Sequence, residues 1–210
     1  MELNQLLNLY KKESREALSF LDLEAVASLT EKIIDCYHNG NKIFLLGNGG
    51  NAAYCANWAT DLALHPFVSE DKDTPLQVSK RLKVFNLSSD PTTITGIVND
   101  LGGDAIFVEQ LKYLADSKDL VIGLSGSGNS PNIVKAFDYA LSKGMFTVGI
   151  TRNSLGAIVR LSSLPICLTC KSEFPGQTGK NEGNFHFEDM LSKISHMTVG
   201  ILKRTVRGSK

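Results

Sequence analysis

Residues 42–51 read KIFLLGNGGN, an apolar run followed directly by a loop of glycine and asparagine. The same arrangement returns at residues 119–130, DLVIGLSGSGNS, where the loop also carries three serines. Each loop stands where a buried strand should end and a helix should begin. Glycines let backbone N–H groups approach an anion, and the start of a helix adds positive potential. Two such loops predict a site for a phosphorylated small molecule.

Three more apolar runs are typical of strands, at residues 81–87, 146–151 and 164–168. Helical patterns alternate with the five runs; they cover residues 2–38, 52–64, 91–98, 104–115, 131–143 and 187–204. Strands that alternate with helices and are nearly all apolar predict a parallel sheet covered on both faces. We therefore expect an α/β fold with a doubly wound, five-stranded parallel sheet and long N- and C-terminal helices.

The length of the chain predicts a single domain over residues 1–210. It would comprise a helical segment at 2–38, an α/β core at 42–170 and a C-terminal helix at about 187–204. In such sheets, ligands bind beyond the carboxyl ends of the strands, near the point where the strand order reverses. Two polar segments, 65–80 and 171–183, are long for a compact domain, and such segments are often lids or flexible.

Composition excludes several classes of protein. The chain has 22 basic and 22 acidic residues and a formal net charge of zero, which is unlike the basic footprint of a nucleic-acid binder. No stretch is long and apolar enough to cross a bilayer, and the N-terminus lacks the basic segment and apolar run of a secretory signal. We expect a cytoplasmic protein with neither a nucleic-acid nor a membrane partner.

Three hydroxyls make the second loop the stronger candidate for phosphate. Ser125, Ser127 and Ser130 stand among glycines just before Pro131, which suits the first turn of a helix. The alternative is that Ser130 only caps this helix and that the glycines only turn the chain. The two hydroxyls ahead of the cap favour phosphate. The loop lacks the lysine of a nucleotide-binding P-loop, so we expect no nucleotide cofactor.

A carboxylate and an amide share one face of the helix that the first loop opens. Asn57 and Asp61 are four residues apart, so they are neighbours on its surface. On the ligand side Asp61 would be a candidate base, and on the solvent side an ordinary surface acid; the sequence favours neither. Asn99 and Asp100 follow the next predicted helix and indicate a turn with a carboxylate, for which a helix C-cap is the default interpretation.

The last predicted helix carries His196 inside an apolar stripe, with Glu188 eight residues earlier. Eight residues span ~12 Å along a helix axis, so the two side chains do not easily hold one ion from a straight helix. A single histidine on such a stripe is more often a core or interface residue than a ligand. The other histidines, His38, His65 and His186, have no convincing partners in the sequence.

These features together resemble the SIS (sugar isomerase) domain family, and within it the sedoheptulose-7-phosphate isomerases, also called phosphoheptose isomerases. The resemblance rests on GNGG at 47–50, VND at 98–100, GLSGSGNS at 123–130 and His196, whose order and spacing match over nearly the whole chain. It implies a doubly wound sheet, a homotetramer and active sites lined by more than one subunit. The implied substrate-binding residues are Asn48, Gly49, Gly50, Asn51, Asp100, Ser125, Gly126, Ser127 and Ser130.

The resemblance also implies roles for these residues. The three serines would hold the sugar phosphate and Asp100 would contact sugar hydroxyls, while Asn51 stands where the family usually has a serine. Some members of the family bind zinc at a His/Glu/Gln/His set, for which this chain has Asn57, Asp61, Glu188 and His196. Because oxygen ligands suit harder cations than zinc, this set is an altered, oxygen-rich version of a divalent-metal site.

The first functional hypothesis is an aldose–ketose isomerase for a phosphorylated sugar, which the resemblance narrows to sedoheptulose 7-phosphate. Asp61 would take a proton from the carbon beside the carbonyl, His196 would move a proton between the two oxygens, and Glu188 would orient one of these side chains. A second hypothesis is a non-catalytic SIS module that binds a sugar phosphate or a protein partner. A third is an isomerase for a different phosphorylated sugar, with the pocket reshaped by the long segments.

Overall fold

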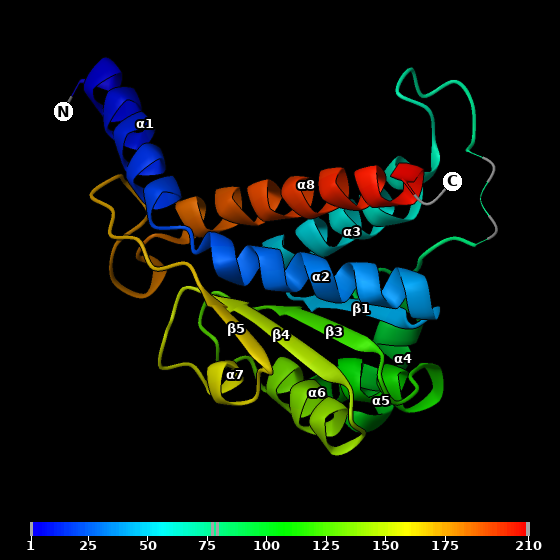
Figure 1. Cartoon of the computed structure of the whole chain (residues 1–210). Helices are drawn as coiled ribbons and strands as arrows, with labels where there is room; N and C mark the ends of the chain where they lie inside the picture. The colour runs from blue at the N-terminus through cyan, green and yellow to red at the C-terminus, as the bar shows by residue number, and fades with distance from the viewer. Residues whose placement is uncertain (1, 77, 79, 209–210) are drawn as a thin grey trace.

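The structure is a computed structural model that describes residues 2–76, 78 and 80–208. Five strands form one sheet in the order β2-β1-β3-β4-β5 (Figure 1). The strands are β1 Lys42–Gly47, β2 Lys83–Asn86, β3 Leu120–Leu124, β4 Phe146–Thr151 and β5 Leu164–Cys167. Every neighbouring pair runs parallel. The predicted doubly wound, five-stranded α/β fold is therefore confirmed.

The strand order reverses between β1 and β3. These two strands are neighbours, with Gly47 in register with Leu124, although β2 lies between them in sequence. The chain leaves β1 toward one edge of the sheet and β3 toward the other, which opens a crevice at their carboxyl ends. Both predicted glycine loops leave the sheet at this point.

Helices surround the sheet. The α-helices of the described residues are α1 Leu3–Ser19, α2 Leu23–Asn39, α3 Gly50–Leu64, α4 Pro91–Leu101, α5 Ile106–Leu114, α6 Pro131–Ser142, α7 Ala157–Arg160 and α8 Asn184–Gly208, with 3-10 turns η1 His65–Phe67, η2 Gly103–Ala105 and η3 Gly179–Asn181. The helical segment expected at 2–38 is divided at residues 20–22, where the Asp22 side chain accepts a hydrogen bond from the Ala25 N–H (3.0 Å) and caps α2. No helix in the described part of the chain is long and apolar enough to cross a membrane.

The turn predicted at Asn99 and Asp100 is wrong. Both residues belong to α4, which continues to Leu101. Gly102, with a φ of +86°, ends the helix instead, because a residue without Cβ adopts this conformation at no steric cost. The carboxylate of Asp100 is therefore carried on the last turn of a helix, where Asn99 Nδ2 donates to its Oδ1 (2.7 Å).

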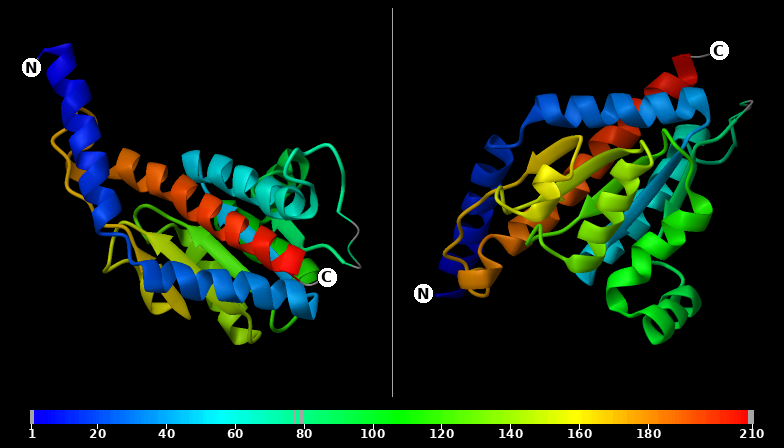
Figure 2. Two further views of the ribbon diagram at one scale, coloured as in Figure 1. Left: turned by 45° about the horizontal axis from the view of Figure 1, so that its top comes forward. Right: turned by 90° about the horizontal axis from the view of Figure 1, so that it is seen from below.

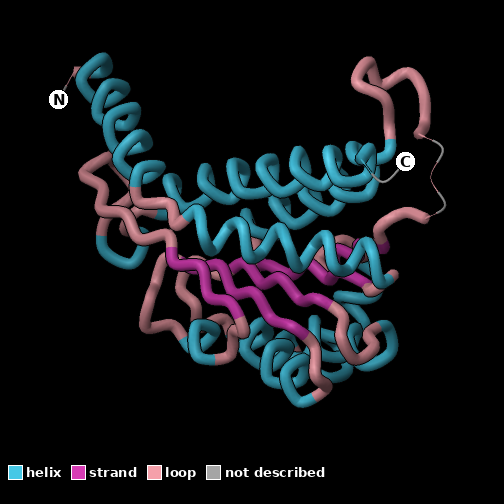
Figure 3. The backbone as a smooth tube through the Cα atoms, in the orientation of Figure 1, coloured by secondary structure: helices cyan, strands magenta, loops and turns pink. Residues whose placement is uncertain are grey.

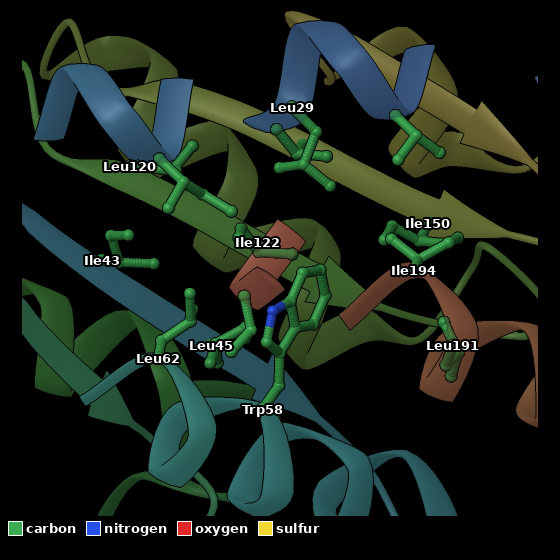
Figure 4. Packing of buried hydrophobic residues seen from close by; sticks show 14 of the residues in the cluster. Leu29, Ile43, Leu45, Trp58, Leu62, Leu120, Ile122, Ile150, Leu191 and Ile194 are labelled. Atoms are coloured by element: carbon green, nitrogen blue, oxygen red, sulfur yellow. The ribbon is translucent and has the colours of Figure 1, made fainter. Parts of the chain in front are cut away.

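The sheet lies between two layers of helices, which Figure 3 shows on either side of the magenta strands. Helices α2, α3 and α8 cover one face, and α5, α6 and α7 cover the other (Figure 1). Successive residues of β1, Ile43 and Phe44, accordingly face opposite cores. In the first core Trp58 of α3 packs near Leu45 (Figure 4). Its Nε1 donates to Thr198 Oγ1 of α8 (3.1 Å), so α3 and α8 are fixed to each other.

Helix α1 projects beyond the sheet and meets the beginning of α8 (Figure 2). A buried ion pair holds it there, with Glu13 Oε2 3.0 Å from His186 Nε2. Ser172 Oγ (2.7 Å) and the Glu173 N–H (2.8 Å) donate to the same carboxylate. Burial acts to raise the pKa of Glu13, but the hydrogen bonds from His186, Glu173 and Ser172 outweigh it and hold that pKa below its ordinary value. His186 thus has a partner that the sequence did not reveal.

Candidate functional site

The two glycine loops are bonded to each other at the switch point of the sheet. Asn48 Nδ2 donates to Asn132 Oδ1 (3.0 Å), and Asn132 Nδ2 donates to Asn48 Oδ1 (2.9 Å). Asn132 lies in the first turn of α6 and is buried. A reciprocal pair of this kind fixes both side-chain amides. The two predicted phosphate loops are therefore held side by side.

The serine loop, residues 125–130, keeps its hydroxyls together. Ser125 Oγ lies 3.1 Å from Ser130 Oγ and also accepts a hydrogen bond from the Gly128 N–H (3.1 Å). Ser130 is the N-cap residue of α6, yet within the described residues its side chain makes no capping hydrogen bond. The alternative of a simple helix cap therefore does not describe this hydroxyl. It remains available at a helix start, which is a ready position for an anion.

Residues at the end of β4 and in the turn after it make hydrogen bonds to the serine loop. Asn153 Nδ2 donates to the carbonyl of Ser127 (2.9 Å), and Thr151 Oγ1 donates to that of Gly126 (3.3 Å). Asn129 Oδ1 accepts from the N–H of Ala157 at the start of α7 (2.9 Å). These contacts fix the conformation of the loop, and the N–H groups of Ser125, Gly128 and Asn129 also donate within the protein. The loop is therefore held in one shape before any ligand binds.

The first loop, residues 47–51, leads into α3 and lies under α8. A Cβ placed on Gly50 would be 3.0 Å from Glu188 Oε1, so the carboxylate of Glu188 rests against the first turn of α3. Asn184 Nδ2 donates to the same oxygen (3.0 Å). Asn51 Oδ1 is buried and has no hydrogen-bond partner in the described part of the chain. Such a group is rare in folded proteins, and here it belongs to the first turn of α3, directly after the first glycine loop.

A cavity of about 1010 Å³ adjoins the serine loop. Gly126, Ser127 and Asn129 line it, and so do residues of the segment predicted as a lid or flexible loop, 171–183. Arg152 ties this segment to the end of β4, since its guanidinium donates to the carbonyls of Lys180 and Glu182. The other long segment, 65–80, lies elsewhere: none of its described residues lines the cavity, and Lys203 Nζ of α8 donates to the carbonyl of Ser69 (3.3 Å).

Asp61 is surrounded by nitrogen atoms near the C-terminal end of α3. Asn57 Nδ2 donates to its Oδ2 (3.2 Å), and His196 Nε2 of α8 is 3.8 Å from the same oxygen. His65 Nε2 lies 3.4 Å from Oδ1. The side chain of Asp61 is 16% exposed, compared with 64% for His196. The structure thus brings together Asn57, Asp61 and His196, three of the four residues of the set that the family resemblance implied, and adds His65, for which no partner was evident in the sequence.

Comparison with known proteins decides the family. The sequence profile of the SIS domain matches residues 10–152. This chain belongs to the SIS domain family. It is 36% identical to a phosphoheptose isomerase of Trichlorobacter lovleyi over 143 residues, which cover 68% of each chain. It is 35% identical to one from Shewanella sp. strain ANA-3 over 154 residues, 73% of this chain and 72% of the relative.

Solved SIS structures share the fold. A phosphoheptose isomerase from Francisella tularensis superposes with a TM-score of 0.77 at 22% identity, and one from Neisseria gonorrhoeae with a TM-score of 0.76 at 23% identity. Each alignment covers 97% of this chain and 100% of the other. At this level of identity the likeness concerns the arrangement of the sheet and helices, including the long C-terminal helix.

The metal set that the SIS family suggests does not converge on one point in this chain. Glu188 lies at Gly50, in the first turn of α3, whereas Asp61 lies eleven residues further along that helix, or ~16 Å along its axis. Asn57 is a weak zinc ligand and already donates to Asp61. Among the described residues, no group of three or more His, Cys, Asp or Glu side chains is arranged to hold a metal ion. These donors therefore do not fit a single zinc ion.

Two residues of the site were missed, for different reasons. His65 follows Asp61 by four residues at the end of the same helix, a spacing that makes side chains neighbours. The sequence analysis placed it instead at the start of a polar loop. Asn132 shows its role only when the strand order places α6 beside the first loop.

Proposed function

We propose that this SIS protein interconverts sedoheptulose 7-phosphate and an aldoheptose 7-phosphate. It is an aldose–ketose isomerase of a phosphorylated sugar, as its relatives named phosphoheptose isomerases indicate. Two observations together carry the proposal. The serine loop stands at the start of α6 and the Ser130 hydroxyl does not cap that helix, and the carboxylate of Asp61 on α3 lies beside the imidazole of His196 on α8. The first element suits a phosphate and the second suits proton transfer.

The phosphate end of the sugar would be bound at the switch point. The hydroxyls of Ser125, Ser127 and Ser130, together with backbone N–H groups at the start of α6, would surround the phosphate oxygens. Gly126 allows the backbone to approach closely, since a Cβ there would lie 3.2 Å from both Arg152 Nε and Asn184 Oδ1. The Asn48–Gly49–Gly50–Asn51 loop would close the other side of this pocket, and Asp100 would reach sugar hydroxyls from the end of α4.

Asp61 and His196 would carry the proton transfers. In the ketose-to-aldose direction, Asp61 takes a proton from C1, the C–H electrons form the C1–C2 double bond of an enediolate, and the proton returns to C2. His196 moves the hydroxyl proton from O1 to O2, so that C1 becomes the carbonyl carbon. Glu188 lies beside Gly50 rather than beside these groups, so we assign it to holding the sugar instead of orienting either one. No step of this scheme passes through a metal ion or a nucleotide cofactor.

We also propose that a homotetramer completes the site. Within one chain, the first turn of α3 and Asp61 are separated by ~16 Å along the helix axis, which is longer than an extended seven-carbon sugar phosphate. A serine loop from one copy and an Asp61–His196 pair from another would meet more easily around one substrate. The proposed location is the cytoplasm, where the four free thiols of this chain stay reduced.

Turnover of sedoheptulose 7-phosphate tests the function. Asp61→Asn and His196→Ala should each abolish turnover and keep the rise in thermal stability that the sugar phosphate gives. Asp35→Asn, an exposed aspartate on α2, is the matched control and should remain active. Full activity of either site variant would reject the assigned roles. No turnover by the native chain, with thermal stabilisation by the sugar phosphate, would identify a binding module.

A further inference from the structure

Asp61 has an imidazole beside each of its two oxygens. His65 Nε2 lies 3.4 Å from Oδ1, and His196 Nε2 lies 3.8 Å from Oδ2. Asn57 Nδ2 adds a hydrogen bond to Oδ2 (3.2 Å). Asn57 and His65 stand four residues before and four residues after Asp61, so all three share one face of α3. The Asp61 carboxylate thus lies between Asn57, one turn earlier along the helix, and His65, one turn later.

The position of His65 is fixed by the chain on both sides. Its N–H bonds to the carbonyl of Asp61 as the last turn of α3 closes. The next residue, Pro66, has a fixed φ, and Phe67 is fully buried. The three residues form η1, which packs against both α3 and α8. The backbone that carries the His65 ring is therefore fixed between α3, which holds Asp61, and α8, which holds His196, although the His65 side chain is 38% exposed.

We propose that His65 is a positioning residue for Asp61 in the isomerase reaction. This inference rests on the proposed function, because it assigns the base to Asp61. A carboxylate on a short aspartate side chain rotates about its terminal bond unless both oxygens are held. Asn57 restrains Oδ2 and His65 restrains Oδ1, so the plane of the carboxylate is set relative to the substrate carbon and to His196. His65 itself need not touch the sugar.

The chain offers a physical reason why such a residue is needed. The turn before Asp61 carries Asn57, whose side chain is an amide and not an imidazole. An imidazole is thus missing from the turn before the base. In this structure one is supplied from the turn after it, by His65. A misplaced catalytic group costs rate rather than binding, so the effect of His65 should concern kcat.

Kinetics of His65→Leu and His65→Gln test the inference. Leucine removes the partner of Oδ1, and glutamine at the same position still donates to an aspartate four residues earlier. We expect His65→Leu to lower kcat by ~100-fold, with KM and the unfolding temperature little changed. His65→Gln should recover much of that loss. His38→Gln, an exposed histidine at the end of α2, is the control and should keep native kinetics.

The outcomes separate this inference from the function on which it rests. If the native chain turns over the sugar phosphate and His65→Leu matches its kcat, His65 is not a positioning residue. If His65→Leu loses kcat only together with its folded state, or if His65→Gln is as slow as His65→Leu, the role is structural and the inference is rejected. If the native chain itself fails to turn over the substrate, the proposed function is rejected, and this inference with it.

Discussion

Replacing Glu13 by leucine measures how firmly the wall of the cavity is attached to the fold. Glu13 and His186 are 7% and 1% exposed and lie 3.0 Å apart. Leucine would leave His186 buried without its partner, and it would also remove the acceptor of Ser172 Oγ and of the Glu173 N–H. Breaking a buried pair by removing one member costs ~3–5 kcal/mol. Each kcal/mol lowers Tm by ~2–4 °C in a chain of this size, so a fall of ~6–20 °C is expected.

The assay is thermal unfolding followed by circular dichroism, with Glu16→Leu as the control. Glu16 is exposed on the same helix and forms only a surface ion pair with Lys12 (3.7 Å), which contributes ~1 kcal/mol or less. A Glu13→Leu variant that is as stable as Glu16→Leu would refute the reasoning. The comparison isolates burial, because helix, residue type and substitution are the same.

The pH dependence of the same variant supplies a second check. Burial acts to raise the pKa of Glu13, but its hydrogen bonds hold that pKa below the ordinary value. A carboxyl group with a depressed folded-state pKa stabilises the fold at neutral pH and loses this contribution as pH falls through that pKa. The difference in Tm between the native chain and Glu13→Leu should therefore be largest at neutral pH and shrink in acid. A difference that grows in acid would contradict the assigned sign.

Two further predictions concern the site. Gly128 has a φ of +68°, and a Cβ there would lie 2.9 Å from the Cα of Gly156. Gly128→Ala should therefore lower the free energy of unfolding by ~1–2 kcal/mol or more and, by distorting the serine loop, raise KM for the sugar phosphate at least ~10-fold. Gly144→Ala, with a φ of +75° and no described atom within 4 Å of its Cβ, should show the strain alone, and equal KM values for the two variants would count against the serine loop. An Asp61→Asn variant and a Ser127→Ala, Ser130→Ala double variant should each be inactive alone. If two copies share a site, refolding them together should restore turnover, because some sites then combine an intact serine loop with an intact Asp61. A mixture that stays inactive would place the whole site within one chain.

The fold was predictable because its signals are local. The apolar runs at 42–46 and 119–124, each followed by glycines, identified two neighbouring strands and the loops at the switch point. The division between α1 and α2 was missed, since residues 20–22 contain neither glycine nor proline and the cap at Asp22 is a single local signal. Helix α7 was missed because four residues are too few to show a period.

The candidate site was predictable only in part. The serines and the Asn57–Asp61 pair follow from spacing along one element. The position of Glu188 depends instead on how α3 packs against α8, and the partnership of Glu13 with His186 joins residues 173 positions apart. Contacts of this kind are set by tertiary packing, for which neither hydrophobic periodicity nor a short motif carries a signal.

In the proposed site, the space for the sugar and the chemistry on it are assigned to different parts of the fold. The segment 171–183 and the serine loop both line the cavity, whereas Asp61 and His196 meet about three helical turns beyond the start of α3. Changes in that segment alter the shape of the cavity without moving the base or the acid. If the proposed site is correct, altering the least regular part of the chain changes which phosphorylated sugar fits, while the sheet and the helices that hold Asp61 and His196 stay the same.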